Sequence, residues 1–303
     1  MILALLLAQL APATPSVPSP IPIISPIETN PNASPLSERS LLAQGLQSAA
    51  ARAKVLGGTL GAVIVDLGNG ASVDINGDVS LPMQSVQKLP VAVVVYREID
   101  AGRLKTDQTI HVMKNDLVPY ASSVNDDYAK RTDYSISELT ELMVEESDNS
   151  AQQALIRIIG GIDTVNADMA NLGYGAIYCS PSDDGYAKPL ALSQFLADLN
   201  SGKLLSQSST KIVLGMMAKA STFPGRLRAG FPAGTLVEHK TGTSGTVDGV
   251  RDATNDVGIV QVNGRTLIVV AMLHGAWGKD SQRDAILASV SRTAYEATRQ
   301  FPI

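Results

Sequence analysis

The stretch Ser85-Val86-Gln87-Lys88 opens the apolar run LPVAVVVY at 89–96, and the rest of the chain is organised around it. The run is typical of a buried helix. A serine and a lysine three residues apart on a helix share one face, so the Lys88 amine can reach the Ser85 hydroxyl. A buried lysine also releases its proton more readily than a solvated one. The stretch therefore predicts a serine nucleophile that is activated without histidine.

An S-x-x-K tetrapeptide occurs by chance roughly once in a chain of this size, so the prediction of a nucleophile depends on two further motifs. A second copy, at 208–211, is interpreted as a helix start with a solvated lysine. Ser147-Asp148-Asn149 follows a predicted helix, and Lys240-Thr241-Gly242-Thr243 ends a predicted strand. The tripeptides Ser-Asp-Asn and Lys-Thr-Gly are each expected by chance in only about one chain of this length in twenty. Their order and context point to one shared site.

The composition excludes several classes of function. The chain has 303 residues, a net charge of −5 and no basic cluster, which argues against a nucleic-acid partner. Its only cysteine, Cys179, cannot form an internal disulfide. The three histidines, His111, His239 and His274, are scattered and predict no metal site. We expect a monomer that uses neither a metal nor another cofactor.

The first residues are typical of an export signal. An apolar stretch at 2–10 precedes the small-x-small pattern Ala11-Pro12-Ala13, so we predict a signal peptide at 1–13. Residues 14–36 are rich in Pro and Ser and predict a disordered linker, followed by a catalytic domain at 37–303. An uncleaved N-terminal anchor is the alternative. We expect an exported protein, periplasmic or extracellular, and an uncleaved anchor would tether it to the membrane at its N-terminus.

Hydrophobic periodicity divides the folded part into three regions. A helix at 37–54 and strands at 59–67 and 71–75 come first. The middle is helical, at 136–146, 151–159, 163–171, 190–199 and 206–217. Strands at 234–240, 253–262 and 265–273 and a helix at 280–300 close the chain. We predict an α+β fold in which both chain ends form one antiparallel sheet flanked by helices, with an all-helical lobe inserted at about 85–217. The boundary of the lobe is a natural cleft.

The motif set resembles that of class A β-lactamases and the related penicillin-binding proteins. Three flanking segments add to the resemblance, which covers nearly everything from Ser37 onward. Asn115–Tyr120 resembles the loop that carries the family's aromatic gatekeeper, Arg226–Gly230 resembles the segment ahead of the K-T-G strand, and Thr254–Asp256 resembles the start of the next strand.

The resemblance implies the following chemistry. Ser85 attacks an amide carbonyl and forms an acyl-enzyme, and Lys88 takes its proton directly or through water. The backbone N–H groups of Ser85 and Thr243 form an oxyanion hole. Ser147 relays a proton to the leaving nitrogen, steered by Lys240.

It also implies substrate-binding residues. Asn149 binds the side-chain amide of the substrate. Thr241, Gly242 and Thr243 bind its carboxylate together with Lys240, and Arg226 assists. Arg251 is a weaker candidate for that carboxylate, and Tyr120 walls the cleft. For Arg226, Arg251 and Tyr120 a purely structural role is the competing interpretation. His239 invites a serine–histidine site, but no G-x-S-x-G elbow is present.

The chain departs from the family at the step that clears the acyl-enzyme. Class A β-lactamases carry a glutamate for this step on the loop after the Ser-Asp-Asn helix, whereas no glutamate lies between Glu146 and Glu238 here. The corresponding segment, 175–189, is short, and Gln153 replaces an asparagine that braces the glutamate. Asp183 or Asp184 is a candidate substitute, although turn formation before Gly185 is the competing interpretation.

Three functions follow from these observations. The first is a class A β-lactamase-like serine hydrolase that opens β-lactam rings through an acyl-enzyme, slowly because the glutamate is absent. The second is a D-alanyl-D-alanine peptidase, a penicillin-binding protein that acts on peptidoglycan stem peptides. The third, non-enzymatic, is a β-lactam sensor domain. The expected partner is therefore a small-molecule β-lactam or a D-Ala-D-Ala peptide.

Overall fold

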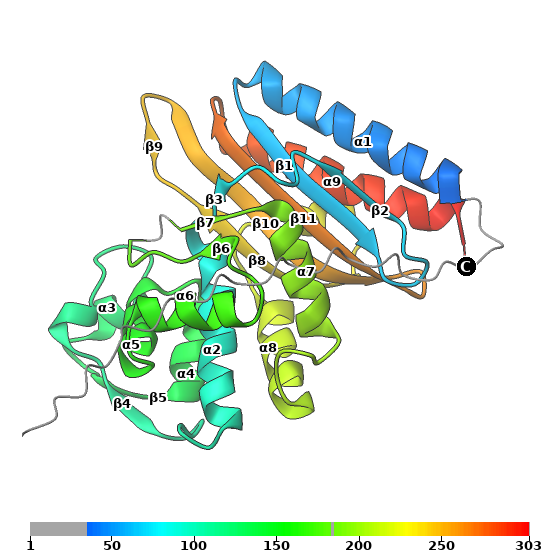
Figure 1. Cartoon of the computed structure of the whole chain (residues 1–303). Helices are drawn as coiled ribbons and strands as arrows, with labels where there is room; N and C mark the ends of the chain where they lie inside the picture. Colours follow the sequence, from blue (N-terminus) through cyan, green and yellow to red (C-terminus); the bar gives the residue numbers. More distant parts are fainter. Residues whose placement is uncertain (1–34, 183–184, 303) are drawn as a thin grey trace, which may run out of the picture.

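A computed structural model describes residues 35–182 and 185–302, and its centre is an antiparallel sheet in the order β2-β1-β11-β10-β8, with β9 beside β10 (Figure 1). The strands of this sheet are β1 Thr59–Asp66, β2 Ser72–Ile75, β8 Leu236–Thr243, β9 Thr246–Val247, β10 Val250–Val262 and β11 Arg265–Ala276. β1 lies against β11, with Thr59 opposite His274. The predicted sheet built from both ends of the chain is therefore confirmed.

The turn between the two longest strands follows from its sequence. Asn263 and Gly264 both have positive φ, at 51° and 74°. This is the backbone of a two-residue hairpin whose twist matches that of the strands it joins. The turn sets β10 and β11 in register, and Asn255 on β10 and Met272 on β11 are partners further along.

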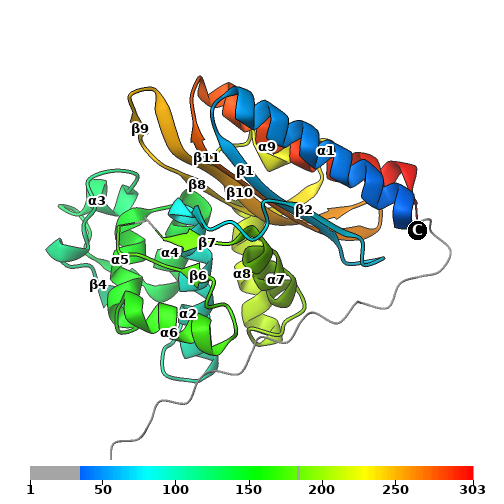
Figure 2. The ribbon, with the colours of Figure 1, turned by 45° about the horizontal axis from the view of Figure 1, so that its top comes forward.

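Helices cover both faces of the sheet (Figure 2). α1 Pro35–Val55 and α9 Asp280–Gln300 pack side by side on one face. α7 Pro189–Asn200 contacts β1, β10 and β11 on the other face, and α8 Gln207–Lys219 contacts β8. The central strands are consequently buried on both sides, which explains their nearly continuous apolar sequence.

α1 begins two residues before the predicted start of the folded domain at residue 37. The helix begins at Pro35, so the last two residues of the predicted linker 14–36 are helical. Proline is favoured in the first helical turn, because its missing N–H has no partner to lose there. The predicted signal peptide 1–13 and the rest of the linker lie outside the described residues. Within residues 35–182 and 185–302, no helix is long and apolar enough to cross a membrane.

The helical lobe follows β3 Leu81–Pro82 and packs around one buried helix. η1 Gln84–Gln87 is a 3₁₀ turn that continues as α2 Lys88–Asp100, whose first nine residues are buried. Around α2 lie β4 Thr109–His111, η2 Lys114–Asp116, α3 Ser123–Asp127, β5 Asp133–Ser135, α4 Ile136–Glu141, η3 Leu142–Glu146, α5 Asn149–Ile158, α6 Ile162–Asn171, β6 Ile177–Tyr178 and β7 Tyr186–Ala187. The short strands were not predicted, because two or three residues are too few to show a period.

One acidic side chain of the sheet is held in an unfavourable environment. Glu238 lies on β8 opposite Ile259, and burial raises the pKa of its carboxyl to about 7. No described residue forms a hydrogen bond or ion pair with this carboxylate. The folded protein therefore binds the Glu238 proton more tightly than the unfolded chain does.

This carboxyl makes stability depend on pH in a defined direction. Its contribution is present at low pH and is lost as the pH rises to about 7, because the folded state then has to ionise a buried group. We expect the stability of Glu238→Gln relative to the wild type to be higher at pH 8 than at pH 5 by about 1 kcal/mol, a value discounted for solvent contact. Urea unfolding at both pH values measures this, with Glu296→Gln on α9 as the control. An equal effect of Glu238→Gln at pH 5 and pH 8 would contradict the assignment.

Candidate active site

Ser85, Lys88 and Asn149 meet at the start of α2. The Lys88 Nζ lies 2.8 Å from the Ser85 Oγ and 2.7 Å from the Asn149 Oδ1. Lys88 is fully buried, whereas Ser85 is partly exposed on the wall of a cleft. The spacing of three residues across the junction of η1 and α2 thus places the serine and the lysine on one face, as predicted. The lysine is within reach of the serine proton.

Ser147 and Lys240 form a second hydroxyl–amine pair facing the same cleft. The Lys240 Nζ donates to the Ser147 Oγ at 3.0 Å and to the Thr241 carbonyl at 3.3 Å. Ser147 follows the π-helix η3 and has left-handed backbone, with φ 65°. π-Helical turns and left-handed non-glycine residues are both enriched at functional sites. The local chain reversal presents the Ser147 hydroxyl to the cleft.

Asp148 holds two segments of the site together through its carboxylate. Its carboxylate accepts hydrogen bonds from the Ser122 hydroxyl at 2.9 Å, the Ser123 hydroxyl at 3.1 Å and the Val124 amide at 3.0 Å. It also caps α5 by accepting from the Ala151 amide at 2.8 Å. Asp148 therefore ties the loop after Tyr120 to the helix that carries Asn149. Its position at a helix N-cap was the available sequence signal.

The edge of the sheet reaches the nucleophile turn at Gly242. A Cβ on Gly242 would lie 2.2 Å from the Met83 carbonyl oxygen and 3.2 Å from the Val86 amide. Only glycine permits this approach of β8 to η1. Asn255 on β10 holds the two together, since its Nδ2 donates to the Pro82 carbonyl at 2.8 Å and the Met83 carbonyl at 3.0 Å.

The backbone of Thr243 faces the same gap. The next amide, that of Ser244, donates to the Ala253 carbonyl on β10 at 3.0 Å. Because backbone groups alternate in direction along a strand, the Thr243 N–H points the opposite way, toward the free edge beside η1. The Thr243 Oγ1 is buried and has no hydrogen-bond partner among the described residues. Thr243 lines the cleft, so both groups lie at the site.

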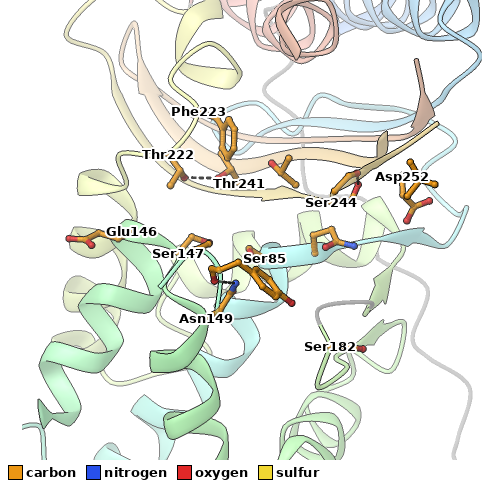
Figure 3. A pocket seen from close by; sticks show the side chains of 16 residues that line it. Ser85, Glu146, Ser147, Asn149, Ser182, Thr222, Phe223, Thr241, Ser244 and Asp252 are labelled. Carbon is orange, nitrogen blue, oxygen red and sulfur yellow. Dashed lines mark hydrogen bonds between the residues drawn. The ribbon is translucent and has the colours of Figure 1, made fainter. Parts of the chain in front are cut away.

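A cleft of about 810 Å³ joins these groups (Figure 3). Ser85, Ser147 and Asn149 lie on one side of it, and Thr222, Thr241 and Ser244 lie on the other. The remaining lining residues are Gln84, Tyr120, Ala121, Glu146, Ser182, Phe223, Thr243, Gly245, Val247 and Asp252. The predicted site at the boundary of lobe and sheet is therefore a real cavity.

Backbone strain is concentrated around this cleft. Four of its lining residues have positive φ without being glycine, namely Gln84 at 51°, Ala121 at 47°, Ser147 at 65° and Phe223 at 50°. Such conformations cost on the order of 1–3 kcal/mol each and persist only where the surrounding structure enforces them. The walls of the cleft are thus set by the fold and not by local preference.

Tyr120 and Arg226 were both expected to contact the substrate, but only Tyr120 lines the cleft. Tyr120 lines the cleft, is 65% exposed and accepts a hydrogen bond from the Asn149 Nδ2 at its carbonyl. Arg226 is 1% exposed and does not line the cleft. Its guanidinium donates to Asp284 at 2.8 Å and to the Asn255 carbonyl at 2.9 Å. These groups hold the Arg226 guanidinium behind β8, which favours the structural interpretation, and its contact with a substrate carboxylate stays a prediction.

The two weaker candidates also lie away from the reacting groups. Arg251 donates to the Ser244 carbonyl and forms an ion pair with Asp280. His239 is fully buried and contacts Asp256 at 2.9 Å. Since side chains alternate along a strand, His239 points away from the face that carries Lys240.

Three side-chain amides fix the loop that the family uses for deacylation. Gln87, inside the S-x-x-K motif, exchanges two hydrogen bonds with the Ser180 backbone, at 2.8 and 2.9 Å. Asn166 does the same with Cys179, at 2.9 and 2.8 Å, and the Gln153 Nε2 donates to the Pro181 carbonyl at 2.9 Å. The loop consequently brings Ser182 to the cleft. Asp183 and Asp184, the candidate substitutes for the glutamate, lie outside the described residues.

Comparisons with known proteins agree with this geometry. The family model described as "Beta-lactamase enzyme family" matches residues 42–298. The chain belongs to the β-lactamase enzyme family. It is 32% identical to the β-lactamase VEB-1 of Pseudomonas aeruginosa over 227 residues, which cover 70% of this chain and 76% of that protein.

Solved structures of the family share the fold. A β-lactamase from Chitinophaga pinensis superposes with a TM-score of 0.80 at 32% identity, covering 84% of this chain and 99% of that one. A variant of PBP-A, in an acyl-enzyme complex with penicillin G, has a TM-score of 0.76 at 24% identity and covers 88% of this chain and 97% of that one, which shows the fold alone. The chain is thus a serine β-lactamase-type hydrolase of the class A fold, as the motifs predicted.

Gly242 offers a direct test of the contact between sheet and nucleophile. We expect Gly242→Ala to slow acylation by benzylpenicillin by at least about 100-fold, because misplacing reacting groups by about 1 Å costs that much. Stopped-flow competition against a fluorescent penicillin measures the rate. Gly215→Ala is the control, since nothing lies within 4 Å of the Cβ it would add on α8. Unchanged acylation in folded Gly242→Ala would contradict the role given to this contact.

Proposed function

We propose that this protein forms an acyl-enzyme with β-lactams on Ser85 and hydrolyses it slowly. The observation that carries the proposal is the 2.8 Å contact between the Lys88 Nζ and the Ser85 Oγ, buried on the lysine side and open to the cleft on the serine side. In the proposed step, Lys88 takes the hydroxyl proton directly or through water while the Oγ bonds to the lactam carbonyl carbon.

The other groups of the cleft act on the charges that this step creates. The oxygen of the tetrahedral intermediate accepts from the N–H groups of Ser85 and Thr243. The lactam C–N bond then breaks, and the Ser147 hydroxyl, which Lys240 holds at 3.0 Å, passes its proton to the nitrogen and receives in its place the proton that Lys88 took from Ser85. Lys240, Thr241 and the unpartnered Thr243 hydroxyl bind the substrate carboxylate, while Asn149 and Tyr120 contact its acyl side. Gly242 contributes space and no side chain.

Slow hydrolysis follows from what the loop presents to the cleft. Among the described residues, the loop contributes the hydroxyl of Ser182 and no carboxylate. Water at neutral pH attacks an ester slowly without a positioned base, so the acyl-enzyme should persist.

A D-alanyl-D-alanine peptidase is the second candidate, favoured by the same loop. A peptidase is acylated by a peptide, and water or an acceptor amine then takes the peptidyl group from Ser85, so the base that clears penicillin is not required. The groups assigned to the β-lactam would serve equally for a stem peptide ending in D-Ala-D-Ala. We also propose that the protein is exported to a compartment that holds peptidoglycan. We propose that it acts there as a monomer and without a metal ion.

The nucleophile is tested by covalent labelling. We expect Ser85→Ala to abolish labelling by a fluorescent penicillin completely, because the bond forms at the Oγ. Ser208→Ala is the matched control, since Ser208 begins the second S-x-x-K sequence, on the surface of α8. Intact-mass measurement against time, with one equivalent and then an excess of benzylpenicillin, gives the lifetime of the adduct. A label that survives in Ser85→Ala would refute the site.

The missing base is tested on the loop residue that reaches the cleft. We expect Ser182→Glu to shorten the lifetime of the penicilloyl adduct by tenfold or more, as positioned general bases contribute about 10²–10⁴-fold. Ser182→Gln keeps the length without the base and should leave the lifetime as in the wild type. Equal lifetimes in Ser182→Glu and Ser182→Gln would show that the position cannot direct water at the ester.

A further inference from the structure

The charges of the cleft are arranged unequally. Glu146 and Asp252 are the only charged residues that line the cleft within the described part of the chain. Lys88 and Lys240 lie beneath its floor and are fully buried. Figure 3 shows Glu146 at one end of the cleft and Asp252 at the other, with Ser85 between them. A ligand whose carboxylate lies near Lys240 therefore has its other end close to a negatively charged side chain of the cleft.

The edge of β8 sets the direction in which a substrate lies. Thr241 is assigned to the carboxylate and Thr243 to the oxyanion, and Gly245 follows the strand, lining the cleft further along. An extended peptide advances about 3.3 Å per residue, the same step as the strand. A substrate with its carboxylate at Thr241 and its reacting carbonyl at Thr243 thus directs its acyl part toward Gly245.

Asp252 stands at this acyl end. Its neighbour on β10, Ala253, accepts a hydrogen bond from the amide of Ser244, the residue after β8, and Arg251 pairs with Thr246, which places Asp252 across from Gly245. Asp252 is therefore near the side chain that precedes the reacting residue, about the third residue from the carboxyl end of a peptide. Glu146 precedes Ser147 and lies at the opposite, leaving-group end.

The Asp252 carboxylate keeps most of its capacity to bind a cation. Its ion pair in the described chain is to His274, with the Nδ1 3.0 Å from the Oδ1, and that nitrogen also lies 2.8 Å from the Asp252 carbonyl. The neighbouring Arg251 is engaged with Asp280. Asp252 is 56% exposed, so one oxygen and its solvent face remain for a ligand.

We propose that Asp252 selects acyl donors whose acyl side chain ends in an ammonium group. For peptides, this is a diamino acid as the third residue from the carboxyl end; for β-lactams, it is an aminoalkyl acyl side chain. The proposal rests on the proposed acylation of Ser85. Exposed ion pairs of this kind correspond to about two- to fivefold in rate or affinity.

The test compares two penicillins that differ only in charge. One carries a 6-aminohexanoyl side chain and the other carries its N-acetylated form. The second-order rate constant of acylation is measured by competition with a fluorescent penicillin. We expect the wild type to prefer the amine two- to fivefold and the preference to weaken in high salt. Asp252→Asn should remove the preference, and Glu146→Gln should retain it.

The outcomes separate the two proposals. If benzylpenicillin acylates Ser85 but the wild type shows no preference for the amine, the selection by Asp252 is refuted and acylation stands. If no penicillin acylates the protein, the proposed function itself fails. A preference that persists in Asp252→Asn and disappears in Glu146→Gln would overturn the direction assigned to the substrate. Asp252→Lys adds a positive check, because it should favour a chain ending in a carboxylate, such as glutaroyl.

Discussion

The close approach of β8 to the turn before α2 is the constraint on which the site depends. It brings Gly242 against Met83 and Val86, on either side of Ser85, and leaves Lys240 opposite Ser147, 3.0 Å away. A strand edge can come this near a helical turn only where no side chain intervenes, and Gly242 meets that condition. The Asn255 side chain donates hydrogen bonds to the Pro82 and Met83 carbonyls, which would otherwise need water. These bonds fix the position of the lobe relative to the sheet.

In the proposed mechanism, two lysines take the part that histidine takes in other serine hydrolases. Lys88 contacts the proposed nucleophile Ser85, Lys240 contacts the Ser147 hydroxyl that would protonate the leaving nitrogen, and both lysines are buried. Acylation would then depend on groups in the floor of the cleft. Release of the acyl group would depend instead on the loop held by Gln87, whose Ser182 lines the cleft. Under this proposal, acyl transfer and acyl release depend on different parts of the chain.

The sequence predicted what repeats locally or matches a motif. Long strands and helices followed from their periodicity, and the motifs indicated residues that the fold brings together, since Lys88 contacts Ser85 and Lys240 contacts Ser147. Contacts between distant residues could not be predicted in this way. Gln87 meets Ser180 across 93 positions, and Arg226 turns to Asp284 because the folded chain brings that carboxylate behind β8. A motif names the residue type, whereas the neighbours decide whether a side chain faces the ligand or the core.

The pairing of β1 with β11 has a consequence for how the protein is made. Arg265, at the start of β11, is buried against Glu38 of α1 and Asp66 of β1, and it also donates to the Phe301 carbonyl at 2.7 Å. During synthesis the β1–β2 hairpin must wait for roughly 200 residues before its partner strand exists. Until then it exposes an unpaired apolar edge, which favours association with other chains. Folding of this protein is thus a late event, completed only when the last strands and α9 have emerged.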